Sequence, residues 1–166
     1  MSRTATFATA AAFAVAALAA APAPADTIAT TSALLPAVNI DGATGTFLTD
    51  VWIFNPEPTL ENDVTLYFTP AGVDGSNLQG FRIDPPLAPR EAIALKDILK
   101  NYFGKTKTFG LLEVRGKYPI MVTSNTYNVA GAIAGTYGQY SPGQPYRNAL
   151  GFEDSIFGNL YVNGLT

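Results

Sequence analysis

Apolar residues recur at every second position over most of this chain, and that period of two restricts its fold more than any other feature. Val64, Leu66 and Phe68, for example, alternate with threonine and tyrosine, which is the pattern of a strand with one buried and one exposed face. Proline and glycine separate such runs at short intervals, as they do at hairpins and sheet crossings. The runs span residues 34–40, 46–55, 64–69, 79–83, 92–95, 109–115, 120–127, 136–141 and 158–163. They predict an all-β, antiparallel fold.

The run at residues 46–55 is apolar on both faces. One face carries Phe47, Val51 and Ile53, and the other carries Leu48, Trp52 and Phe54. We therefore expect a largely buried strand, which Asn55 and Pro56 bring to an end. Because β-sandwiches commonly bury their largest ring in mid-strand, Trp52 is predicted to lie in the core.

Residues 96–103 follow a helical spacing instead. Leu95, Ile98, Leu99 and Phe103 recur at that spacing, Asp97 is placed in the first turn, Lys100 in the last, and Gly104 at the C-terminal cap. We expect one short helix that bridges two strands. Together with the short strands, it predicts an antiparallel immunoglobulin-like β-sandwich with one short helix, and a small β-barrel is the alternative.

The first 25 residues have the organisation of a secretory signal peptide. Arg3 is the only charged residue before Asp26, an alanine-rich apolar stretch follows it, and Ala23-Pro24-Ala25 offers a small-residue cleavage site. We expect cleavage before Asp26. Cleavage two residues earlier and an alanine-rich membrane anchor are the alternatives. The prediction is an exported protein, periplasmic or extracellular, with a single domain at residues 26–166 and no membrane span after cleavage.

The composition excludes several kinds of chemistry. The chain contains no His and no Cys, so it has no Ser-His-Asp or Cys-His relay, no disulfide, and no zinc or haem site of the usual ligands. Its ten basic and thirteen acidic residues give a net charge of −3 and are scattered along the chain, which argues against nucleic acid as a partner. We expect a protein that is not an enzyme and that uses no cofactor and no metal.

Two groups of carboxylates are candidate sites, but each has a simpler structural explanation. Asp41-Gly42 and Asp74-Gly75 offer oxygen ligands of the kind that calcium prefers, but an Asp-Gly pair is ordinary turn chemistry. Glu57, Glu61 and Asp63 are predicted to form a charged hairpin tip rather than the two facing carboxylates of a glycosidase.

Short phrases along the chain resemble a known kind of module. They are LLPAV at 34–38, FLTDVWIFNP at 47–56, VTLYFTPAG at 64–72, IALKDIL at 93–99, GLLEVRG at 110–116, VTSNTYN at 122–128 and GTYGQYSPG at 135–143. Their order resembles the uncharacterised immunoglobulin-like or fibronectin-III-like β-sandwich modules of secreted bacterial proteins, and the likeness covers nearly all of residues 33–145. The resemblance implies a module without catalytic residues.

Modules of this kind often occur in tandem, and the end of the chain looks similar to the start of another copy. GNLYVNGLT at residues 158–166 resembles the opening strand. Two alternatives follow: residues 158–163 pair back into the first sandwich, or residues 156–166 begin a second repeat. A terminal strand without a partner would expose edge hydrogen bonds, through which the chain would self-associate or bind another protein.

A group of tyrosines late in the chain is the strongest sign of a binding surface. Exposed tyrosine rings suit sugar stacking or protein contact, whereas rings that cover the edges of a sandwich would be structural. The candidate ligand-binding residues are Tyr137, Tyr140 and Tyr146, which are interspersed with Gln139, Gln144 and Arg147.

These features together predict an exported, non-catalytic structural or protein-interaction module of the bacterial cell surface or extracellular space. The alternative is a carbohydrate-binding module that uses the exposed tyrosines. The expected partners are accordingly a protein, a second copy paired through edge strands, or a glycan. A small hydrolase with two catalytic carboxylates is a third hypothesis, because such chemistry needs no His.

Overall fold

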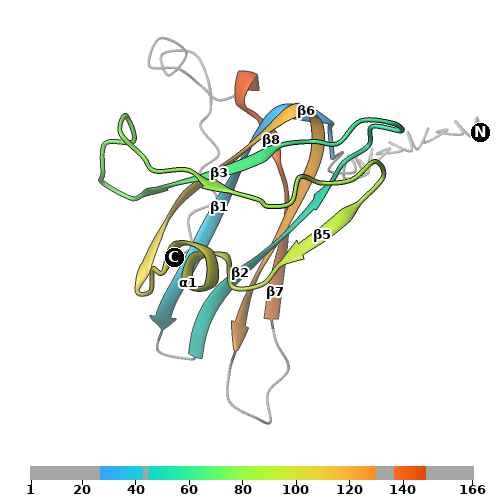
Figure 1. Cartoon of the computed structure of the whole chain (residues 1–166). Helices are drawn as coiled ribbons and strands as arrows, with labels where there is room; N and C mark the ends of the chain where they lie inside the picture. Colours follow the sequence, from blue (N-terminus) through green and yellow to red (C-terminus); the bar gives the residue numbers. More distant parts are fainter. Residues whose placement is uncertain (1–26, 43–44, 130–136, 149–166) are drawn as a thin grey trace, which may run out of the picture.

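A curled antiparallel sheet makes up most of the structure, a computed structural model that describes residues 27–42, 45–129 and 137–148 (Figure 1). The predicted signal peptide at residues 1–25 and the predicted strand at 158–163 lie outside the described residues. The described strands are β1 (Thr30–Gly42), β2 (Gly45–Phe54), β3 (Val64–Pro70), β4 (Phe81–Arg82), β5 (Ala92–Leu95), β6 (Thr108–Val129), β7 (Tyr137–Pro142) and β8 (Gln144–Pro145), joined by helix α1 (Ile98–Phe103) and followed by a 3₁₀ turn, η1 (Tyr146–Asn148).

Strand β6 is 22 residues long and belongs to both halves of this sheet. Its residues 110–115 lie between β1 and β3, whereas residues 123–128 lie between β2 and β7. In Figure 1, β6 runs up one side of the molecule, bends at the top and returns down the other side. We call β4-β3-β6-β1-β8 the first half-sheet and β5-β2-β6-β7 the second half-sheet. Because β1 also pairs with β2 near their hairpin, the sheet closes around a single core.

The core lies between the two half-sheets and is built from alternate residues of each strand. Helix α1 closes it with Ile98 and Leu99, both fully buried, and contacts β1 and β2. The inward side chains of the strands are Ala33, Leu35, Ala37, Val51, Ile53, Val64, Leu66, Phe68, Leu95, Leu112, Val114, Ile120 and Val122. The alternation predicted from the sequence therefore sets which face of every long strand is buried.

The bend in β6 depends on a buried asparagine from another part of the chain. Asn62 is fully buried, its Nδ2 donates to the carbonyl oxygen of Tyr118 at 3.0 Å, and its Oδ1 accepts from the Tyr118 N–H at 3.0 Å. The Lys117 N–H donates to the Asp63 carbonyl oxygen at 2.9 Å. These bonds satisfy the backbone where the regular pairing of β6 with β1 shifts. They allow one strand to pass from the first half-sheet to the second.

A second buried asparagine, Asn55, fixes the loop that follows β2. Its Nδ2 donates to the carbonyl oxygens of Leu60, Leu87 and Ala88 at 2.9, 3.2 and 3.0 Å. The predicted end of the strand at Asn55 is confirmed, since β2 stops at Phe54. The asparagine does more than stop the strand, because its amide joins two loops that are far apart in the sequence.

Helix α1 is shorter than predicted and differs at its start. Asp97 is the N-cap residue, with φ 43°, rather than a member of the first turn. Gly104 is the C-cap, as predicted, and its φ of 62° is a left-handed conformation that suits glycine. The Gly104 and Lys105 N–H groups donate to the carbonyl oxygens of Lys100 and Leu99.

The all-β, antiparallel fold with one short helix is confirmed, and the curled sheet is compatible with the alternative of a small barrel. Its immunoglobulin-like character stays a prediction. The runs at 109–115 and 120–127, which were predicted as two strands, form one strand, β6. Within residues 27–42, 45–129 and 137–148, no helix has the length and apolar character needed to cross a membrane.

The prediction that Trp52 lies in the core is wrong. Trp52 is 36% exposed, whereas its neighbours Val51 and Ile53 are fully buried. Strand β2 is apolar on both faces, but the curled sheet encloses only the face that carries Val51 and Ile53. Trp52 therefore lies on the outer face of the second half-sheet.

We expect Asn62→Ala to destabilise the fold strongly, because the Tyr118 N–H and carbonyl groups would lose their partners at the bend. The expected loss in the free energy of unfolding, measured by urea denaturation, is roughly 2–4 kcal/mol. Asn77→Ala is the matched control, since Asn77 is exposed and, within the described part of the chain, its amide donates one hydrogen bond, to the neighbouring Ser76 hydroxyl. Equal stability of the two variants would contradict the role of Asn62.

Candidate functional site

The outer face of the second half-sheet gathers aromatic and polar side chains from three strands. Trp52 on β2 pairs with Thr123 on β6, and Asp50 pairs with Asn125, which in turn pairs with Tyr140 on β7. Directly paired residues of adjacent strands lie on the same face, with Cβ atoms roughly 4.5–5.5 Å apart. We call Asp50, Trp52, Thr123, Asn125 and Tyr140 the Trp52 face.

Trp52 borders a shallow hollow on this face. The hollow has a volume of about 190 Å³ and is lined by Thr27, Trp52, Ile53, Phe54, Ala92, Met121 and Thr123. On the β5 side, Trp52 and Phe54 pair with Ala94 and Ala92, which are too small to cover the rings. The Lys96 ammonium lies 4.7 Å from the centroid of the Trp52 ring, a cation–π contact that helps to hold the indole in place.

Asp50 is the most constrained charge on the Trp52 face. Its side chain is 5% exposed, and Lys96 Nζ lies 2.7 Å from Oδ2. The Asp97 N–H and the Tyr127 hydroxyl donate to Oδ1 at 2.9 and 3.3 Å. A buried carboxylate is tolerated only when it is paired and hydrogen-bonded, and Asp50 meets both conditions. This arrangement ties the segment before α1 to β2 and leaves Asp50 poorly placed to act as a free base.

Tyr127 shows the electrostatic consequence of this arrangement. Burial raises the pKa of its phenol, and the negative charge of Asp50 and the hydrogen bond to that carboxylate raise the pKa further. The phenol is thus held neutral as a hydrogen-bond donor. Its role is to satisfy Asp50 rather than to exchange protons.

Thr123 and Asn125 differ from the other polar side chains nearby, because they are half-buried yet form no side-chain hydrogen bond with any part of the described structure. On the inner face, by contrast, the hydroxyls of Thr49 and Thr126 bond to each other at 2.9 Å. Tyr140 is 55% exposed, and its hydroxyl lies 2.9 Å from the Thr27 hydroxyl. The Trp52 face thus combines two accessible rings with polar groups that are free to bind.

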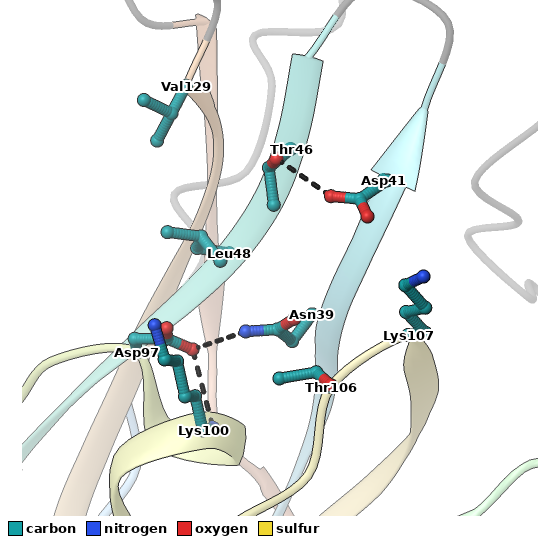
Figure 2. Close-up of a pocket in the computed structure, with 9 residues that line it drawn as sticks. All are labelled: Asn39, Asp41, Thr46, Leu48, Asp97, Lys100, Thr106, Lys107 and Val129. Atoms are coloured by element: carbon teal, nitrogen blue, oxygen red, sulfur yellow. Dashed lines mark hydrogen bonds between the residues drawn. The ribbon is translucent and has the colours of Figure 1, made fainter.

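A second hollow, of about 400 Å³, lies at the end of the β1–β2 hairpin beside α1 (Figure 2). Figure 2 shows Asp97 between Asn39 and Lys100, with its Oδ1 accepting from Asn39 Nδ2 at 2.8 Å. Asp41 accepts from the Thr46 hydroxyl at 2.9 Å. Both carboxylates of this hollow are therefore engaged by their own neighbours, and it has no exposed aromatic ring in its lining.

The structure does not bring the three predicted tyrosines together. Tyr140 belongs to the Trp52 face, where it pairs with Asn125, whereas the Tyr137 backbone pairs with Asn128, three residues further along β6. Tyr146 is 57% exposed but lies in η1, beyond β8, which pairs with β1 of the first half-sheet. Trp52 is the residue of this candidate face that the sequence did not predict.

Asp74 and Asp63, two of the candidate carboxylates named in the sequence analysis, form contacts with residues nearby in the fold. Asp74 accepts from the Ser76 N–H and hydroxyl, as expected of a turn. Asp63 forms an ion pair with Arg82. Among the residues that the structure describes, no group of three or more Asp, Glu, His or Cys side chains is placed to hold a metal ion.

The comparisons with known proteins bear on the fold and not on the function. The chain matches no protein-family model and no curated protein sequence. It is similar to a solved structure, Thermotoga maritima 1070, with a TM-score of 0.52 and 12% sequence identity, over 70% of this chain and 94% of that one. At this identity the likeness concerns the arrangement of strands.

The position of Trp52 can be tested directly, since it is the single tryptophan of the chain. We expect acrylamide to quench its fluorescence in the folded protein less strongly than in the unfolded chain but more strongly than it quenches a buried indole, because Trp52 is 36% exposed. The control is the double variant Trp52→Phe/Phe68→Trp, which moves the reporter to a core position that is 3% exposed. Equal quenching of the two proteins would mean that Trp52 lies in the core.

The raised pKa of Tyr127 predicts that the folded protein loses stability in alkali. A pKa raised on folding gives stability that is complete below the ordinary value of 10.0 and is lost as the pH rises through the higher folded value. Tyr127→Phe removes this ionisation, so its melting temperature should fall less than that of the parent above pH 10.0. Tyr140→Phe, which removes an exposed phenol, should keep the alkaline loss of the parent. The same alkaline loss in both variants would count against the prediction.

Proposed function

We propose that this chain is an exported, non-catalytic structural or interaction module of the bacterial cell surface or extracellular space, and that it binds its partner on the Trp52 face. The observation that carries the proposal is Trp52 itself. It places a large ring that is 36% exposed in the middle of a sheet, beside an exposed Tyr140 and an Asn125 whose side chain bonds to no other described residue, and accessible aromatic rings beside polar groups are typical of binding surfaces.

The absence of a catalytic role is supported by how the polar groups are used. Asp50, the buried carboxylate of this face, already accepts from Lys96, Asp97 and Tyr127. The Ser124 hydroxyl is fully buried on the inner face and donates to the Ser141 carbonyl oxygen at 3.4 Å. With no His or Cys in the chain, these groups offer no activated nucleophile.

The proposed export is supported by the composition of residues 1–25 and by the resemblance to secreted modules. The longer edge strands, which could pair with a strand of a partner, belong to the same half-sheet as the Trp52 face. β4 and β8 have only two residues each, whereas β5 and β7 have four and six and form the two edges of the second half-sheet. A protein partner or second copy that adds a strand would therefore meet the sheet next to the Trp52 face.

The proposal is tested by sedimentation of the mature chain with isolated bacterial envelopes, which contain both proteins and glycans. We expect the parent to sediment with the envelopes and Trp52→Ala to stay in the supernatant. Leu111→Ala is the matched control, because Leu111 is 44% exposed on the outer face of the first half-sheet. It should sediment like the parent.

Two outcomes would overturn the proposed function. One is a parent protein that stays in the supernatant at all concentrations. The other is equal sedimentation of the parent, Trp52→Ala and Leu111→Ala, which would remove the Trp52 face from the interaction.

A further inference from the structure

We propose that the ligand of the Trp52 face is a neutral saccharide, with one sugar ring seated in the hollow beside Trp52. This inference rests on the proposed function and names the chemistry of its partner. It is built from four features of the face: an aromatic surface, unpaired hydrogen-bonding groups, an offset charge and a small concave volume.

The aromatic surface comes from Trp52 and Tyr140, which lie on adjacent cross-strand rows of the second half-sheet. Trp52 pairs with Thr123, and Tyr140 pairs with Asn125, two residues further along β6. Sugar rings present flat patches of C–H groups that pack on such rings, because an aromatic side chain offers a large apolar surface with little conformational freedom to lose. A ring on Trp52 would thus lie within one residue row of Tyr140.

The unpaired hydrogen-bonding groups lie between these two rings. Asn125 carries an amide with two donors and an acceptor, and Thr123 carries a hydroxyl that both donates and accepts. Neither side chain bonds to another described residue, although both are half-buried. The neighbouring hydroxyls of a sugar offer the matching donors and acceptors, so a sugar would take the place of water on groups that form no side-chain bond within the described structure.

The charge of the face favours an uncharged ligand. Lys96 Nζ lies 2.7 Å from Asp50 Oδ2, and although the Lys96 side chain is 63% exposed, the buried carboxylate beside it offsets its charge. The Lys96 ammonium also covers part of the Trp52 surface. An anionic polymer would have to compete with Asp50 for this cation, and a cationic one would approach Lys96.

The volume of the hollow suits a single sugar ring better than the surface of a protein partner. Its volume of about 190 Å³ is below the roughly 300–1,000 Å³ of pockets that enclose drug-sized ligands. A protein interface of standard size needs roughly 800 Å² on each partner, with few unpaired polar groups at its centre.

The test is affinity electrophoresis of the mature chain in gels that contain one polysaccharide each: hydroxyethyl cellulose, laminarin, xylan, galactomannan or dextran, with polygalacturonate as the anionic comparison. We expect at least one neutral polysaccharide to retard the protein and to change Trp52 fluorescence. Trp52→Ala should bind that polysaccharide at least about tenfold more weakly. Asn125→Ala leaves the ring in place and should weaken binding roughly three- to tenfold. Leu111→Ala should bind like the parent.

Each other result overturns the saccharide proposal. No retardation by any neutral polysaccharide, retardation by polygalacturonate alone, or binding that survives in both Trp52→Ala and Asn125→Ala would do so. Thermal unfolding of each variant shows whether it is folded. If Trp52→Ala is not folded, the binding of Asn125→Ala decides the test. If protease treatment of the envelopes abolishes sedimentation that depends on Trp52, the partner is a protein, and the proposed function stands without a saccharide.

Discussion

The hydrogen bonds between the Asn62 amide and the Tyr118 backbone make the rest of this architecture possible. A strand that changes partners in mid-course leaves backbone groups unpaired, and buried groups of that kind cost free energy. Asn62 supplies one donor and one acceptor at that point, at 3.0 Å each. One strand, β6, can then pair with β1 and β3 along its first part and with β2 and β7 along its second. The enclosed core and the two outer faces follow from that change of partners.

A charge network orients the side chains of the Trp52 face, in addition to the core packing of Val51 and Ile53 that fixes β2. Asp50 draws Lys96 and the Asp97 N–H to the outer surface of β2, and Lys96 in turn lies over the Trp52 ring. The desolvation of Asp50 is offset because its oxygens all receive donors. The network thereby couples the segment that enters α1 to the orientation of an exposed ring. A face prepared in this way loses less conformational entropy when a ligand binds.

Local patterns predicted most of the strands, because alternation is a property of neighbouring residues. β3 and β5 follow it closely, and Gly104 caps α1 as its position suggests. The continuity of β6 could not be predicted, since Gly116 and Pro119 resemble strand breaks and their compensation comes from Asn62, 54 or more residues away in the sequence. Trp52 was misplaced because β2 is apolar on both faces. Asp50, which shares its face, was the available signal that this face is the outer one.

The two outer faces that the curled sheet leaves open differ in chemistry. The first half-sheet exposes Phe109 and Leu111, which are 53% and 44% exposed and whose side chains carry no hydrogen-bonding group. On the second half-sheet, Trp52 and Tyr140 lie beside Thr123 and Asn125, whose side chains bond to no other described residue. Thr123 also lines the hollow beside Trp52. Because β6 contributes to both faces, the core packing that fixes its inward side chains also sets which of its residues each outer face presents.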